Sequence, residues 1–320
     1  MHDLSKASVA WGRISEDSEN QRIDNYLAKV LKGVPKSHIY RILRSGEVRV
    51  NSKRVRPTYR LQVGDKLRIP PVRTARPTRQ GTASRSNLLL EVLFEDDGLL
   101  AINKPSGVAV HGGSGVSSGI VELLRMRDPK PRFLELVHRL DRETSGVLLL
   151  AKKRSALTRL HQMLRTGEIE KRYLVLVKGR WLNQKQIVKL PLNKYVTAFG
   201  ERRVAVKTGG QAAHTLFFLR RNWQEFSLLE AELKTGRTHQ IRAHLAHLGF
   251  PVLGDAKYGD FALNRELAKR GLNRMFLHAC KLVVKHPVSG AILQLEAPLP
   301  RDLQRFIDNL EGRHAEPSKN

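Results

Sequence analysis

Two charged side chains stand directly ahead of an apolar run in residues 138–152, which read HRLDRETSGVLLLAK. Arg139 and Asp141 are two residues apart, so in an extended segment their side chains point the same way. An aspartate side chain is ordinarily ionised at neutral pH and can act as a nucleophile or a base. An Arg-x-Asp triplet alone is more often a structural ion pair than a catalytic site.

The apolar run behind this pair predicts a buried strand that carries Asp141 at its start. Residues 147–151 are all apolar and are bounded by Gly146 and Lys152. The small residues 144–146 predict a turn that brings polar side chains back over the start of the strand. We therefore expect a carboxylate and a guanidinium together at the mouth of a core strand.

Two later segments carry further residue types that suit a site. Tyr173 lies in a predicted strand that reads KRYLVLVKG, where a tyrosine most often serves packing. Residues 236–249, GRTHQIRAHLAHLG, predict a helix, because Ile241 and the leucines after it fall at helical spacing. Thr238 is its predicted N-cap and Gly249 its predicted stop.

Metal and nucleotide sites find little support in the sequence. His239, His244 and His247 are spaced i, i+5 and i+8, which differs from the i, i+4 pair of a zinc-binding helix. Residues 103–115, NKPSGVAVHGGSG, are glycine-rich but lack the Gly-Lys-Ser/Thr of a phosphate-binding loop. The single cysteine, Cys280, excludes an internal disulfide and a cysteine-based metal cluster. We expect no metal and no cofactor.

The charge balance indicates a polyanionic partner. The 320 residues include 57 Lys and Arg against 30 Asp and Glu, which gives a formal net charge of +27 and a pI of about 10.7. Nucleic acid is the first candidate partner and an anionic membrane surface the second. No apolar run approaches the roughly 18 residues that span a bilayer, and the N-terminus lacks a signal-peptide core. We therefore expect a cytoplasmic protein that binds nucleic acid and no membrane.

Changes of pattern along the chain predict two domains with connecting segments. The predicted segments are a flexible N-terminal arm (1–19), a small basic domain (20–72), a basic linker (73–87), a large domain (88–305) and a C-terminal tail (306–320). The small domain reads as two short helices followed by short strands. It holds 13 Lys and Arg against 3 acidic residues, so its surface must be strongly cationic.

The small domain resembles the S4 RNA-binding domain through the pattern SGEVRVNSKRV at residues 45–55, followed by VGD. This resemblance covers the whole of residues 20–72. It implies that basic side chains contact RNA phosphates, which positions RNA without reading its sequence. The candidate phosphate-binding residues are Lys36, Arg41, Arg44 and Arg54.

The large domain resembles the RluA-type family of RNA pseudouridine synthases. The string HRLD-x-x-TSG, the tyrosine motif around Tyr173, the sequence GRTHQIR at 236–242 and the loop at 103–115 all match motifs of that family. The resemblance implies an α+β domain built on a mixed, mainly antiparallel sheet. Its reaction breaks the N1–C1′ bond of uridine, turns the base and joins C5 to C1′. No redox change or external group is involved, so no cofactor or metal is implied.

The same resemblance assigns roles to individual residues. Asp141 would be the catalytic aspartate, Tyr173 would lie against the flipped base, and Arg242 would pair with the catalytic carboxylate. Arg139 would fill the gap that the flipped uridine leaves, because a planar cation that stacks there offsets part of the flipping cost. His239 and Leu277 would shape the uracil pocket. Whether Asp141 attacks the base, attacks the sugar carbon or removes a ribose proton stays open.

The combination of S4 domain, glycine-rich loop and HRLDRETSG string resembles the C subgroup of large-subunit rRNA pseudouridine synthases. It predicts a monomeric isomerase that modifies several uridines of 23S ribosomal RNA. One alternative is the same chemistry on another RNA, such as the rRNA sites of the D-type subgroup or a tRNA. Another is a non-catalytic ribosome-assembly factor that binds RNA through the S4 domain alone. The intact set of Asp141, Tyr173 and Arg242 argues against the last.

Overall fold

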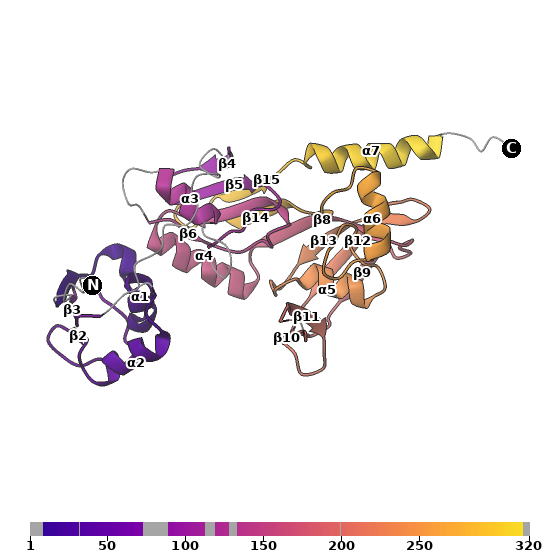
Figure 1. The fold of residues 1–320 in the computed structure, drawn as a ribbon. Helices are drawn as coiled ribbons and strands as arrows, with labels where there is room; N and C mark the ends of the chain where they lie inside the picture. Colours follow the sequence, from indigo (N-terminus) through magenta and orange to yellow (C-terminus); the bar gives the residue numbers. More distant parts are fainter. Residues whose placement is uncertain are drawn as a thin grey trace, which may run out of the picture. The chain divides into compact units, whose positions relative to one another are not determined.

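The computed structural model describes residues 9–31, 33–72, 89–112, 119–127, 133–198 and 200–315, with side chains up to residue 311. Contacts between Cα atoms divide the chain into two compact units, Met1–Ser84 and Arg85–Asn320. The smaller unit is drawn in indigo in Figure 1. The predicted linker 73–87 and the end of the glycine-rich loop, residues 113–115, lie outside the described residues.

The smaller unit combines two helices with a three-stranded antiparallel sheet of order β1-β3-β2. Its elements are β1 (Ala10–Arg13), a 3-10 helix (Glu16–Ser18), α1 (Ile23–Val30), α2 (Lys36–Arg44), β2 (Arg49–Val50) and β3 (Lys66–Ile69). The helices form because their apolar residues share one face: Ile23 and Leu27 of α1 and Ile39 and Ile42 of α2 are fully or almost fully buried. Both predicted helices are therefore confirmed.

The prediction of a flexible arm over residues 1–19 is wrong for Ala10–Arg13. This segment is strand β1, whose four residues pair with β3 in antiparallel register from Ala10 opposite Ile69 to Arg13 opposite Lys66. All four side chains are exposed, so the sequence shows no alternation of apolar and polar residues. The strand is held by backbone hydrogen bonds to its neighbour, which leave no mark in the sequence pattern.

The larger unit is built on one extended sheet and one small hairpin. The strands of this unit are β4 (Glu91–Glu95), β5 (Leu99–Lys104), β6 (Glu135–Leu136), β7 (Ser145–Ala151), β8 (Glu170–Lys178), β9 (Lys185–Val188), β10 (Leu192–Val196), β11 (Arg202–Val206), β12 (Thr215–Asn222), β13 (Phe226–Leu233), β14 (Leu277–Lys285) and β15 (Ile292–Glu296). The main path of the sheet runs β4-β5-β7-β14-β8-β13-β12-β9, with β15 beside β14 and β6 beside β7. Strands β10 and β11 form a separate antiparallel hairpin.

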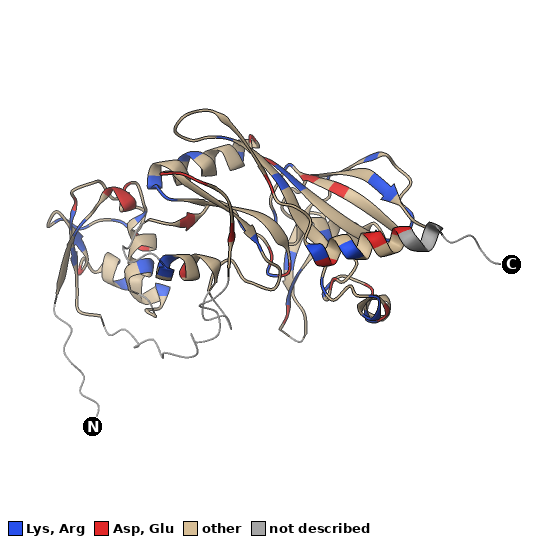
Figure 2. Ribbon diagram, turned by 90° about the horizontal axis from the view of Figure 1, so that it is seen from above, with Lys and Arg blue, Asp and Glu red and all other residues tan. Residues whose placement is uncertain are grey.

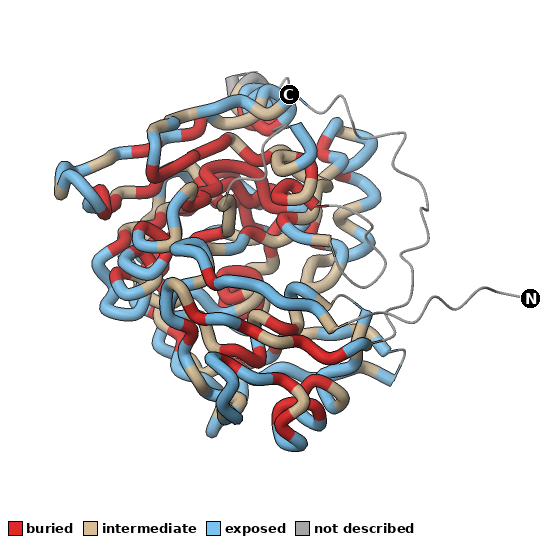
Figure 3. Tube along the Cα trace, turned by 90° about the vertical axis from the view of Figure 1, so that its left-hand side faces the viewer, coloured by how far each residue is buried: buried red, intermediate tan, exposed pale blue. Residues whose placement is uncertain are grey.

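The sheet is mixed and mainly antiparallel, as predicted. Among the described strands, β7 and β14 form the one parallel pair, through His278 opposite Ser145 and Ala279 opposite Gly146. All seven residues of β7 are buried, which confirms the predicted core strand. Figure 3 shows buried residues in red along the strands, with exposed residues in pale blue on the outer segments.

Five helices of the described residues pack on this sheet: α3 (Ile120–Arg127), α4 (Arg154–Thr166), α5 (Gln240–His247), α6 (Phe261–Lys269) and α7 (Arg301–Ala315). Helix α4 buries Ala156, Leu157 and Leu160 against the strand residues Val147 and Leu149. Helices α3 and α5 contribute to a second cluster that includes Tyr173. Across the described residues, no helix has both the length and the apolar character needed to cross a membrane.

The prediction of a C-terminal tail over residues 306–320 is wrong for its first part. Helix α7 continues to Ala315, and Phe306, Ile307 and Leu310 are buried with Leu303 in one apolar cluster. These residues fall at helical spacing, so the helix buries a stripe against the core while its other faces stay polar. Figure 1 shows α7 in yellow beside α6, which contributes Leu267 to the same cluster.

Candidate active site

Asp141 lies in the turn that precedes β7. The backbone N–H of Thr144 donates to the carbonyl of Asp141 at 3.1 Å, which closes the turn before the strand begins. Gly146 has a φ of +112°, and a Cβ at this position would come within 2.1 Å of the carbonyl oxygen of Ala279. Only glycine therefore allows β7 to approach β14 so closely, and this approach fixes the base of the turn that carries Asp141.

A buried lysine supports the same turn from behind. The Nζ of Lys104 donates to the carbonyls of Pro105, Val108 and Arg142 at 2.8, 2.8 and 3.0 Å. Burial lowers the pKa of Lys104 to about 7, with Glu143 and Asp141 opposing the shift. Because Arg142 follows Asp141 directly, Lys104 ties the turn that carries Asp141 to the glycine-rich loop.

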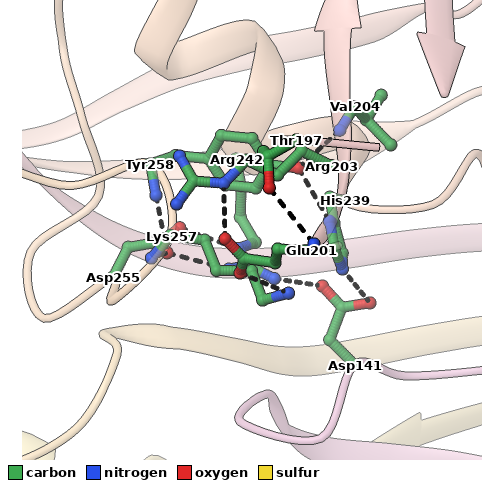
Figure 4. A network of polar contacts seen from close by, with 10 residues as sticks. All are labelled: Asp141, Thr197, Glu201, Arg203, Val204, His239, Arg242, Asp255, Lys257 and Tyr258. Carbon is green, nitrogen blue, oxygen red and sulfur yellow. Dashed lines mark hydrogen bonds and ion pairs between the residues drawn. The ribbon is translucent and has the colours of Figure 1, made fainter. Parts of the chain in front are cut away.

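Arg242 connects two carboxylates. Its Nη1 donates to Oδ2 of Asp141 at 2.9 Å, while its Nε and Nη2 donate to Oδ2 and Oδ1 of Asp255 at 2.7 and 2.8 Å. The predicted pairing of Arg242 with Asp141 is therefore present, but the bidentate pair is made with Asp255 (Figure 4). The Arg242 side chain is 6% exposed and that of Asp255 is fully buried.

Asp255 is the partner that sequence reasoning missed. Burial alone would raise the pKa of Asp255, but hydrogen bonds and charge from Arg242 outweigh it and lower the pKa. The backbone N–H groups of Lys257 and Tyr258 also donate to its Oδ1, at 2.8 and 3.1 Å. Its Gly-Asp dipeptide reads as an ordinary turn in the sequence, so nothing there indicates a buried ion pair.

His239 stands next to this pair at the start of α5. It is the N-cap residue and has a left-handed backbone with φ of +52°, a conformation that costs most non-glycine residues roughly 1–2 kcal/mol. The predicted cap at Thr238 is wrong, because the helix begins one residue later and no side chain caps it. His239 directs Nε2 toward Oδ1 of Asp141 at 3.9 Å and Nδ1 toward the hydroxyl of Tyr258 at 2.9 Å.

One cavity of about 520 Å³ opens onto these groups. Six of the predicted site residues line it: Arg139, Asp141, Tyr173, His239, Arg242 and Leu277. Tyr173 and Leu277 are 6% and 3% exposed and come from the neighbouring strands β8 and β14. The structure therefore brings together residues from widely separated parts of the chain. Tyr173 keeps its phenolic hydrogen, because burial raises its pKa well above the ordinary value.

Four basic residues that the sequence did not single out also line the cavity. Arg165, Lys171, Lys234 and Arg237 line it, and Asp141 is the one carboxylate among its lining residues. Lys171 lies two residues before Tyr173 on the same face of β8, and burial lowers its pKa. Among the described residues it has no carboxylate within ion-pair distance. Such a cation favours an anion in the cavity.

The four predicted phosphate contacts lie in the smaller unit and are all exposed. Lys36, Arg41 and Arg44 belong to α2, and Figure 2 marks such basic residues in blue. The side chain of Arg54 lies against Gly46, just beyond the end of that helix. Arg54 also lines a groove of about 500 Å³ together with Lys53 and Arg56. The carboxylate of Glu47 lies 3.7 Å from the guanidinium of Arg41.

Comparison with known families identifies the class of protein. The family of RNA pseudouridylate synthases matches residues 98–247, and the S4 domain matches residues 21–67. A solved structure, Human RNA Pseudouridylate Synthase Domain Containing 4, aligns with a TM-score of 0.56 and 26% identity over 69% of this chain and 93% of that one. The chain belongs to the RNA pseudouridine synthase family and carries an S4 domain ahead of the synthase domain.

Relatives with curated names narrow this class. The Ribosomal large subunit pseudouridine synthase C of Pasteurella multocida (strain Pm70) is 49% identical over 301 residues, which are 93% of this chain and 92% of that protein. The protein of the same name from Escherichia coli (strain K12) is 49% identical over 314 residues, or 95% and 98%. The similarity thus spans both units and the segment between them, and it confirms the predicted family and fold.

Proposed function

We propose that this protein converts uridines of 23S ribosomal RNA to pseudouridine, with Asp141 as the catalytic aspartate. The observation that carries the proposal is the carboxylate of Asp141, fixed at the mouth of a cavity through one oxygen. Oδ2 accepts a hydrogen bond from Arg242, and Oδ1 accepts none from any described residue. The names of the full-length relatives support large-subunit rRNA as the substrate.

The reaction needs the base to leave the sugar and return by a different atom. The N1–C1′ bond breaks, the base turns, C5 bonds to C1′, and the hydrogen of C5 is replaced while N1 gains one. A carboxylate held at the sugar–base junction serves as nucleophile or base in either route. Arg242 holds Asp141 in position, and Asp255 in turn holds Arg242. Geometric restraint of this kind accounts for a large part of enzymatic acceleration.

The walls of the cavity suit a flipped uracil. Tyr173 offers an aromatic ring, which contributes roughly 1–3 kcal/mol per stacked base. Leu277 provides an apolar side chain from the adjacent strand. Arg139 is exposed at the rim, where a guanidinium stacks in the gap that the extruded base leaves. We assign Tyr173 to the base, Arg139 to the gap, and the ammonium of Lys171 to a backbone phosphate.

The S4 domain supplies sequence-independent affinity in this scheme. Lys36, Arg41, Arg44 and Arg54 are the residues that we assign to phosphate contacts, because all four are exposed and none is held by a buried carboxylate of the described residues. Neutralising phosphates releases counterions, so these contacts favour binding most strongly at low salt. We also expect the protein to be a monomer in the cytoplasm. It would need no cofactor, since the reaction is an internal rearrangement.

A map of pseudouridines in total RNA tests this function. Cells with and without the gene would be compared position by position, and cells that carry Asp141→Asn would serve as the control. We expect specific uridines of 23S RNA to lose modification in the deletion and to stay unmodified in the variant. Loss confined to tRNA, or no loss at any site, would contradict the proposed substrate.

A further inference from the structure

Tyr258 joins the catalytic cavity to the β10–β11 hairpin. Its hydroxyl accepts a hydrogen bond from the backbone N–H of Val204 at 2.8 Å and lies 2.9 Å from Nδ1 of His239 (Figure 4). Val204 belongs to β11, while His239 is the N-cap residue of α5. The hydroxyl therefore stands between a hairpin outside the main sheet and a residue that faces Asp141.

The direction of the hydrogen bonds follows from the number of hydrogens available. A tyrosine hydroxyl has one hydrogen, and burial raises the pKa of Tyr258, so this hydrogen stays in place at neutral pH. The N–H of Val204 already donates to the oxygen, and Nδ1 of His239 is the one acceptor within reach among the described residues. Tyr258 therefore donates to His239.

An imidazole that accepts at Nδ1 carries its proton on Nε2 when it is neutral. Burial lowers the pKa of His239, with the charge of Asp141 opposing the shift, so the ring is neutral at physiological pH. The Nε2 proton then faces Oδ1 of Asp141 at 3.9 Å, while Arg242 donates to Oδ2 at 2.9 Å. Each oxygen of the catalytic carboxylate is thus opposed by an N–H group.

The other tautomer would reverse this arrangement. It would place the lone pair of Nε2 opposite the negatively charged oxygen of Asp141, and the two would repel each other.

Tyr258 also contacts the second partner of Asp141. The guanidinium carbon of Arg242 lies 5.1 Å from the centre of the Tyr258 ring, a cation–π arrangement. The ring meets that of His239 edge-on, with centres 5.6 Å apart and an angle of 71° between planes. One side chain therefore packs against both groups that face the carboxylate.

We propose that Tyr258 is a positioning residue of the isomerase: its hydroxyl, held by the N–H of Val204, keeps His239 in the tautomer with its proton on Nε2, facing Asp141. The inference rests on the proposed function, because it concerns the same carboxylate. Tyr258 acts through His239 and does not itself contact the substrate. The contact between Val204 of the β10–β11 hairpin and Tyr258 is therefore a requirement for this arrangement around Asp141.

The tautomer is directly measurable by NMR on the full-length protein labelled with nitrogen-15 at histidine. His239→Gln identifies the signals of His239, and spectra of the wild type and of Tyr258→Phe are then compared. We expect an unprotonated Nδ1 and a protonated Nε2 in the wild type, and a mixture of tautomers in Tyr258→Phe. Tyr195→Phe is the matched control, because Tyr195 is an exposed tyrosine of the same hairpin, on β10.

Single-turnover kinetics on rRNA provide the second measurement. We expect Tyr258→Phe to lower the rate by about tenfold, which corresponds to about 1.4 kcal/mol, with RNA affinity changed less than about twofold. Tyr195→Phe should keep the wild-type rate. A wild-type His239 protonated on Nδ1 would overturn the inference, and this spectrum decides the question even if Tyr258→Phe does not fold. A rate loss in Tyr258→Phe without a change of tautomer would also overturn it.

The two measurements separate this inference from the proposed function. The tautomer is read in the absence of RNA, so it does not depend on which substrate the protein modifies. A wild-type protein that has the expected tautomer but forms no pseudouridine in rRNA would contradict the function and leave the role of Tyr258 in orienting His239 intact.

Discussion

Basic side chains are prominent both in the smaller unit and in the cavity of the larger unit, but the surroundings of these side chains differ. Arg41 of α2 has a side chain that is 60% exposed, with the carboxylate of Glu47 at 3.7 Å. Arg242 of the cavity is 6% exposed and donates to two carboxylates at 2.7–2.9 Å. An exposed charge is screened by salt and worth little to the fold, whereas removing one partner of a buried ion pair is strongly destabilising.

In the proposed function, this difference separates two tasks within one chain. Exposed cations attract RNA over a distance and tolerate imprecise placement, because they contact a uniformly charged backbone. The network of Asp141, Arg242 and Asp255 holds the carboxylate of Asp141 in one orientation, as the proposed chemistry requires. Substitutions in the first region should therefore change binding, and substitutions in the second should change stability and rate.

The largest expected effect on stability comes from Asp255→Ala. The substitution leaves the buried guanidinium of Arg242 with Asp141 alone, and removal of one partner from a buried pair costs about 3–5 kcal/mol. Urea unfolding of the full chain measures this loss. Asp97→Ala is the control, because Asp97 is 99% exposed and 3.9 Å from Lys153, so its removal should change little. Equal losses in both variants would remove the distinction between buried and exposed charges.

Tyr173→Phe tests the cavity by removing one oxygen and keeping the ring. If the hydroxyl moves a proton at C5, we expect kcat to fall by about a hundredfold, a typical contribution of general acid–base catalysis. RNA affinity should stay close to that of the wild type, because the stacking surface remains. Tyr173→Leu should weaken binding as well, since the aromatic surface is removed. Wild-type turnover by the Phe variant would limit Tyr173 to stacking.

The basic residues of the smaller unit should act through salt. Replacement of Lys36, Arg41, Arg44 and Arg54 by Ala should flatten the dependence of the logarithm of RNA affinity on the logarithm of salt concentration. The slope should change by close to one unit for each phosphate that is no longer neutralised. The rate at saturating RNA should not change, because the buried network around Asp141 keeps all its residues. An unchanged salt slope would mean that this cationic surface does not touch phosphates.

A smaller effect concerns acid. The pKa of Asp255 is lowered in the folded state, so its ionised form stabilises the fold above the pKa of the unfolded chain, and this stabilisation is lost as pH falls through the folded value. The difference in unfolding free energy between the wild type and Asp255→Asn should therefore shrink from about pH 5 downward. A difference that stays constant to about pH 3 would show that Asp255 does not contribute through its charge.

Much of the fold could be predicted because its signals are local. The strand at 147–151 is a continuous apolar run, and helix α4 repeats its apolar residues at helical spacing. The strand Ala10–Arg13 has no such signal, because its side chains are exposed and its order comes from pairing with β3. Helix α7 was not predicted, although its apolar residues fall at helical spacing, because residues 306–320 were interpreted as a polar tail.

Only those residues of the site that belong to a family motif could be predicted from the sequence. Asp141 and Arg242 are 101 residues apart and were joined through family resemblance, not through any physical pattern between them. Asp255, Tyr258 and Lys104 were missed, because their importance lies in what they contact after folding. A buried aspartate in a Gly-Asp turn looks like any surface turn until its partner is known.

The most direct test of the central claim is turnover by Asp141→Asn on rRNA that carries tritium at C5 of uridine, with RNA affinity measured in parallel. Bond formation at C5 releases the tritium, so release reports the isomerisation itself. We expect no release above background and an affinity within about tenfold of the wild type, or about 1.4 kcal/mol. Release at the wild-type rate would contradict it, because the chemistry would then proceed without the carboxylate of Asp141.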